Sequence, residues 1–173
     1  MDFIGTDTVS ITMENQKFQQ IIQLQATKNY QFHIIHHSHN DIGYSHLQTE
    51  VERIQTKNIR DALSWISNNQ ASTVEAVWHI ESLWAVENFL RNATETETQN
   101  FIEAVKEGNI VLSANYANVL TGLSQREELN WLVEYAKQLE QTYGIHVSNA
   151  MITDIPGITQ AGLENYTRNH KPY

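Results

Sequence analysis

From Tyr30 onward, the sequence alternates short apolar stretches with longer amphipathic ones, and this alternation limits the fold more than any other feature. It is typical of βα units, in which parallel strands share one sheet and each strand is followed by a helix. The pattern predicts four strands, at residues 32–35, 74–78, 109–114 and 147–153. We therefore expect an α/β fold with about half the strands of a closed (β/α) barrel, either as an open sheet or as part of a larger barrel.

Amphipathic segments after these strands predict helices at residues 47–66, 82–90, 97–107 and 124–144, with a last short helix that ends near residue 166. The helix at 124–144 has the clearest boundaries. Ser124 and Glu127 have the spacing of a capping box, and Gly144 suits the left-handed conformation that follows many helices. The four tryptophans, at positions 65, 78, 84 and 131, fall mostly on predicted core faces, so we expect them to pack inside.

Residues 1–29 do not follow the βα pattern, and we interpret them as an N-terminal extension to a main domain at residues 30–173. Residues 8–13 alternate between polar and apolar side chains, as an edge strand does. Residues 18–22 fit either a strand or a helix. The sequence therefore leaves the shape of this extension open.

Composition excludes several classes of function. The chain has 20 acidic and 11 basic side chains, a net charge of −9, so we expect no broad positive surface and no nucleic-acid partner. It has no cysteine, which excludes disulfides, thiol catalysis and cysteine-bound zinc. Any metal site must therefore use histidine, aspartate or glutamate.

No apolar run approaches the ~20 residues that cross a bilayer, and the N-terminus lacks the basic and apolar regions of a signal peptide. These features predict that the chain has no membrane partner and favour a cytoplasmic location. An unpaired last strand in an open sheet favours self-association, so we also expect a homo-oligomer.

Histidines are concentrated at residues 36–41, directly after the first predicted strand. In an extended chain, His37, His39 and Asp41 point to one face because side chains alternate along a strand. The carboxyl ends of parallel strands are where α/β folds keep their active sites. Two imidazoles and a carboxylate suit a divalent ion such as zinc. The alternative is a polar loop that happens to be rich in histidine.

Other polar residues end the remaining predicted strands. Asp154 follows the fourth strand and precedes a Pro-Gly turn, so it is either a helix N-cap or a further metal ligand. The same rim also receives residues from the second and third strands, namely His79, Glu81, Asn115 and Tyr116. Each of these four, taken alone, is more typical of a structural position than of a catalytic one.

Residues 37–44, His-Ser-His-Asn-Asp-Ile-Gly-Tyr, closely resemble the His-Ser-His-Asn-Asp-Pro-Gly-Trp signature of family 38 glycoside hydrolases, the zinc-dependent retaining α-mannosidases. Six of the eight positions are identical, and Ile42 and Tyr44 are the two departures. Further similarity lies at residues 78–82, 108–113 and 150–157, and the resemblance covers residues 30–165 in all.

This resemblance implies a carbohydrate substrate, with His39, Asp41 and Asp154 as Zn²⁺ ligands and Asp154 as the catalytic nucleophile as well. We assign His37, Glu81 and Tyr116, on the same rim, to substrate binding. The family's fourth zinc ligand, a histidine, and its general acid have no counterpart here. We therefore expect an α-mannosidase-like glycosidase domain that, when isolated, hydrolyses aryl α-mannosides poorly or not at all.

Two other functions stay open at this point. A zinc-dependent polysaccharide deacetylase on a related barrel would use an aspartate and two histidines to hold its metal. Its usual paired aspartates are not found in the sequence, and none of the predicted helices carries its His-x-x-x-His motif. A noncatalytic carbohydrate-binding domain with an incomplete metal site is the third possibility.

Overall fold

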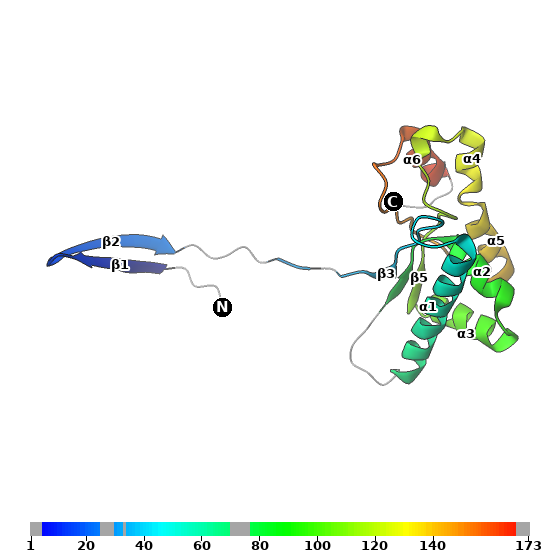
Figure 1. Ribbon diagram of the computed structural model, residues 1–173, viewed down its shortest axis with the longest axis horizontal. Helices are drawn as coiled ribbons and strands as arrows, with labels where there is room; N and C mark the ends of the chain where they lie inside the picture. The colour runs from blue at the N-terminus through cyan, green and yellow to red at the C-terminus, as the bar shows by residue number, and fades with distance from the viewer. Residues whose placement is uncertain (1–4, 25–29, 33, 70–76, 169–173) are drawn as a thin grey trace. The chain divides into compact units, whose positions relative to one another are not determined.

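The computed structural model describes residues 5–24, 30–32, 34–69 and 77–168, and it divides into two compact units, Met1–Ile34 and Ile35–Tyr173. The first unit contains an antiparallel hairpin, and the second contains a parallel sheet with helices (Figure 1). Parts of two predicted strands, namely His33 and residues 74–76, lie outside the described residues.

The hairpin of the first unit pairs β1 (Gly5–Met13) with β2 (Gln16–Leu24) along their whole length. Glu14 and Asn15 form the two-residue turn and both have positive φ, 46° and 68°. Turns of this kind follow the natural twist of paired strands. Residues 18–22, which fitted a strand or a helix in the sequence, are therefore a strand, because the turn places them opposite β1.

The sheet of the second unit has the order β3-β4-β5 and is parallel throughout. Its strands are short: β3 is His36–Ser38, β4 is Trp78–Ile80 and β5 is Ile110–Leu112. Helices separate these strands along the chain, as the βα pattern requires. The predicted α/β class is confirmed.

The first strand begins later than predicted. Residues 34 and 35 are largely exposed, and the ladder starts at His36, which pairs with Trp78. Among the described residues, the ladder pairs 36–38 with 78–80, and Phe32, Ile34 and Ile35 lie outside it. The polar residues 36–38 form β3 instead, which brings the histidine-rich segment into the sheet itself.

The fourth predicted strand, 147–153, is reduced to a single parallel bridge between Ser113 and Asn149. The Ala114 N–H donates to the Asn149 carbonyl at 2.8 Å. Beyond this point the Ser113 hydroxyl accepts from the Met151 N–H at 2.9 Å, so a side chain takes the place of a backbone acceptor. The segment follows β5 without forming a regular ladder.

The helices are α1 (Gln48–Asn68), α2 (Leu83–Asn92), α3 (Glu95–Lys106), the short 3₁₀ helix η1 (Thr121–Leu123), α4 (Arg126–Trp131), α5 (Glu134–Tyr143) and α6 (Gln160–Arg168). In Figure 1, α1, α2 and α3 lie on the same side of the sheet. The core fills the space between these layers. Its largest fully buried side chains include Phe89 and Phe101, whose ring centroids are 5.3 Å apart.

The single helix predicted at 124–144 is two helices, α4 and α5. The Leu132 carbonyl accepts from the Tyr116 N–H at 2.7 Å, so a neighbouring loop occupies an acceptor at the junction between them. The predicted capping box is also wrong by one residue, because the Gln125 N–H donates to Glu128 Oε2 at 2.7 Å. Gly144 does end α5 in the left-handed conformation, with φ 65°.

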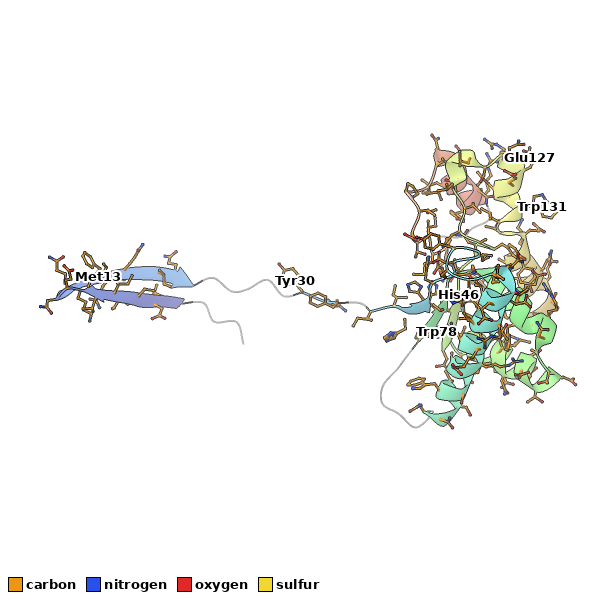
Figure 2. All side chains as sticks on the ribbon, in the orientation of Figure 1. Met13, Tyr30, His46, Trp78, Glu127 and Trp131 are labelled. Carbon is orange, nitrogen blue, oxygen red and sulfur yellow. The ribbon has the colours of Figure 1, made fainter. Side chains whose placement is uncertain are left out.

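Two tryptophans are not in the core. Trp84 is buried, whereas Trp65 and Trp131 are 44% and 70% exposed. Trp131 is the last residue of α4 and points away from the sheet in Figure 2. Among the described helices, none combines the length and apolar character needed to cross a membrane.

Candidate metal centre

The loop after β3 is held in place by two amides from α1. Gln55, which is buried, donates to the His39 carbonyl at 2.9 Å, and Asn58 donates to the Ser38 hydroxyl at 2.8 Å. Both amides come from the face of α1 that packs toward the sheet. Two polar side chains of this helix therefore hold the histidine-rich segment, Gln55 through the His39 backbone and Asn58 through the Ser38 hydroxyl, which the apolar pattern of the helix did not predict.

His39, Asp41 and Asp154 come together at the carboxyl end of the sheet. His39 Nε2 lies 3.3 Å from Asp41 Oδ1 and 3.6 Å from Asp154 Oδ2. One ligand atom from each of the three residues falls within 4.8 Å of the others. This arrangement suits a divalent ion, since the donor set of one imidazole nitrogen and two carboxylate oxygens matches borderline metals such as zinc.

Asp154 sits at the tip of a turn and has a positive φ of 51°. Left-handed backbone costs an ordinary residue roughly 1–2 kcal/mol, although aspartate tolerates it better than most. Strain of this kind concentrates at functional sites. Here it turns the Asp154 side chain, 80% exposed, toward His39 at the mouth of the site.

Glu81 lies beneath His39 and its side chain has no exposed surface. The Nδ1 atom of His39 is 3.0 and 3.1 Å from the two carboxylate oxygens of Glu81. Because a carboxylate only accepts, His39 donates its Nδ1 proton and leaves the lone pair of Nε2 facing the two aspartates. Burial of His39 opposes protonation, but the hydrogen bond that His39 donates to Glu81 and the charges of the nearby carboxylates raise the pKa of His39 above the usual value of 6.5.

Two further side chains complete the surroundings of Glu81. Asn118 and Thr153 both donate to Glu81 Oε1, and Asn118 also donates to the Thr153 hydroxyl at 3.2 Å. Sequence reasoning missed both residues. Asn118 lies in an irregular loop with no motif around it, and only the adjacency of Thr153 to Asp154 was available as a signal.

The segment that carries Asp154 is anchored to the end of β5. Asn115 donates to the Met151 carbonyl at 3.1 Å, and Ser113 accepts from the Met151 N–H. Buried His79 contacts the same segment, with Nε2 3.1 Å from the Asn149 side-chain oxygen. Burial lowers the pKa of His79, so this imidazole is a neutral structural contact at neutral pH.

The remaining sequence-predicted residues lie beside the group. His37 Nδ1 is 3.3 Å from Glu81 Oε2 but is not hydrogen-bonded to it. The Tyr116 hydroxyl donates to Glu87, and burial together with this bond raises the Tyr116 pKa to about 12. The side chain of Glu81 is enclosed. The roles predicted for these residues in substrate binding stay predictions.

An open groove of about 820 Å³ runs beside the β3 edge and α1, and its lining includes His37, Trp65 and Trp78. It includes none of His39, Asp41 and Asp154. The groove therefore neighbours the candidate metal centre and shares His37 with it, but the metal-binding chemistry lies elsewhere.

Comparisons with known proteins support the fold. No protein-family model matches this chain, and no curated protein matches it either. Among solved structures, the chain is similar to a protein in the glycosyl hydrolase family 38 from Enterococcus faecalis, with a TM-score of 0.59 and 15% sequence identity. The likeness is one of fold. It covers 77% of this chain but only 15% of the Enterococcus protein, so the chain spans a small part of that structure.

Proposed function

We propose that this chain carries the metal centre and nucleophile of a retaining glycosidase that acts on α-mannosides or related α-glycosides. The observation that carries the proposal is the position of His39 between two sets of carboxylates. Its Nδ1 atom is hydrogen-bonded to buried Glu81, and its Nε2 atom faces Asp41 and Asp154. The family 38 signature at residues 37–44 and the likeness of fold support it.

Zinc is the metal we propose, held by His39 Nε2 and by one oxygen each from Asp41 and Asp154. Three protein ligands leave a coordination position free, as catalytic zinc sites do. When bound, the ion would supply a fixed positive charge that binds and polarises oxygen atoms of the substrate.

Asp154 is the proposed nucleophile. Its exposed carboxylate is reached from solvent, while its backbone is anchored through Thr153 and Met151. Attack of one Asp154 oxygen on the anomeric carbon forms a covalent ester as the glycosidic bond breaks and its electron pair leaves with the departing oxygen. Water then hydrolyses the ester, and the two inversions retain the configuration of the sugar.

Protonation of the leaving group limits the substrates that this chain can use. Retaining hydrolysis needs a second carboxyl group about 5–5.5 Å from the nucleophile, and the family's general acid has no counterpart in these residues. General acid catalysis contributes typically 10²–10⁴-fold. This chain should therefore hydrolyse aryl glycosides, whose leaving groups need little protonation, faster than alkyl glycosides.

The proposal is tested by metal analysis together with hydrolysis of 4-nitrophenyl α-mannoside. We expect about one zinc per chain and slow aryl glycoside hydrolysis that is lost in Asp154→Asn. The matched control is Asp61→Asn, because Asp61 is an exposed carboxylate that pairs with Lys57 away from the centre. An unchanged rate of hydrolysis in Asp154→Asn would contradict the assignment of Asp154 as the nucleophile. Release of acetate from acetylated sugars would instead support a deacetylase.

A further inference from the structure

Glu81 is the most enclosed carboxylate of the candidate metal centre, with 1% of its surface exposed. Each of its oxygens is engaged. Oε1 accepts from Asn118 and Thr153, and Oε2 lies 3.0 Å from His39 Nδ1. Enclosing a carboxylate is costly unless hydrogen bonds replace its water, and here three side chains supply them.

These three donors connect Glu81 to both ends of the proposed ligand set. His39 comes from the loop after β3, whereas Thr153 is the residue before Asp154. The buried Glu81 carboxylate, just after β4, therefore contacts the proposed ligand His39 directly. It also contacts Thr153, the residue that precedes the proposed ligand Asp154. No regular strand holds residues 150–154, so side-chain bonds such as this one fix where Asp154 lies.

We propose that Glu81 is a positioning residue that sets the tautomer of His39 and, through Thr153, the placement of Asp154. This inference rests on the proposed function and deepens it, because it assigns Glu81 to preparing the metal site in place of touching the sugar. Partners of metal-binding histidines typically change metal affinity by 10–100-fold when they are mutated.

Replacing Glu81 with glutamine gives a specific expected result. Glutamine keeps one side-chain acceptor, its carbonyl oxygen, where glutamate has two carboxylate oxygens. We expect this carbonyl to take the place of Oε1, because Asn118 and Thr153 both donate to that position. The glutamine amide then faces His39 Nδ1, which must accept, so the imidazole proton moves to Nε2. A proton on Nε2 occupies the lone pair that faces Asp41 and Asp154, so this nitrogen can no longer bind a metal without losing the proton.

The tautomer is measured in the metal-free protein by long-range ¹H–¹⁵N correlation at about pH 9, where imidazoles are neutral. The His39 signals are assigned by their loss in His39→Ala. We expect the Nδ1–H tautomer in the parent chain and the Nε2–H tautomer in Glu81→Gln. Zinc affinity, measured against a chromophoric chelator, should fall 10–100-fold in the same variant. Glu87→Gln is the control for charge loss, because Glu87 bonds Tyr116 outside the centre.

A second pair of variants does not depend on Glu81→Gln being folded. Thr153→Val keeps the side-chain shape but removes the hydroxyl that donates to Glu81, whereas Thr153→Ser keeps the hydroxyl. We expect a severalfold loss of zinc affinity in the valine variant and parent-like affinity in the serine variant. A purely packing role for Thr153 would give the opposite order.

An unchanged His39 tautomer in Glu81→Gln, or equal zinc affinities for Thr153→Val and the parent, would overturn the inference. A parent chain that binds no zinc would defeat the proposed function instead. The tautomer comparison would still decide the role of Glu81, because it needs no metal.

Discussion

The Nε2 atom of His39 lies 3.6 Å from Oδ2 of Asp154, although the two residues come from opposite ends of the second unit. The parallel arrangement makes this contact possible, since the loop after β3 and the segment that bridges to Ser113 at Asn149 end at the same edge of the sheet. Three hydrogen bonds then hold this segment: Ser113 accepts from the Met151 N–H, Asn115 donates to the Met151 carbonyl, and Thr153 donates to Glu81.

Ser113 is expected to support both stability and metal binding. Ser113→Ala leaves the part-buried Met151 N–H without its acceptor, which should cost about 1–3 kcal/mol of unfolding free energy. Urea unfolding measures this cost, and chelator competition should show weaker zinc binding. Ser64→Ala on α1 is the control, because the Ser64 hydroxyl accepts a hydrogen bond from Asn68 on the exposed surface of the helix. Equal effects from both variants would contradict the anchoring role of Ser113.

Zinc should raise the unfolding temperature of the chain. At a free zinc concentration 100 times the dissociation constant, binding adds about 2.7 kcal/mol to the stability of the native state. For a chain of this size, that corresponds to an increase of roughly 5–10 °C. Asp41→Asn should remove most of the increase, because it replaces a charged ligand atom near His39 with a neutral amide. Thermal scans with zinc and with a chelator make the comparison.

Zinc binding should weaken as the pH falls. Burial lowers the pKa of His39, but hydrogen bonding to Glu81 and the charges of Asp41 and Asp154 outweigh it and raise this pKa above 6.5. Below its pKa the imidazole carries a proton on each nitrogen and cannot bind a metal. We therefore expect affinity to decline at a higher pH than an unperturbed histidine would give. A chelator titration from about pH 8.5 to 5 tests this, and constant affinity across the range would contradict it.

Glu97 should stabilise α3 in a pH-dependent way. Its hydrogen bonds with Arg60 and the Thr94 backbone lower its pKa from 4.5 to about 2. A lowered pKa means that the stabilisation is complete above the unfolded value of 4.5 and is lost as the pH falls toward 2. The stability gap between the parent and Glu97→Gln should therefore narrow over this interval. Glu95→Gln, in the same helical turn, is the control for urea unfolding at each pH.

Much of the layout could be predicted from the sequence because it depends on local patterns. Apolar periodicity placed α1, α2 and α3 within a few residues, and Gly144 ended α5 where expected. The signature at residues 37–44 pointed to His39 and Asp41 as a candidate pair. Each of these features depends on residues close together in the chain, whose conformational preferences do not require tertiary contacts.

Tertiary contacts decided the rest. The strand at 32–35 became β3 at His36–Ser38, because backbone pairing with β4 determines where a ladder begins. The helix at 124–144 divided where the Tyr116 N–H reached the Leu132 carbonyl.

The residues of the candidate metal centre show the same division between local pattern and tertiary contact. Its residue types are fixed by the sequence: imidazole and carboxylate side chains directly after strands, in a chain without cysteine. Only the fold enclosed Glu81 between His39, Asn118 and Thr153, and only the fold brought Asp154 beside His39. Hydrogen bonds between distant segments have no periodicity in the chain, since their partners meet only when the sheet and its connecting loops are in place.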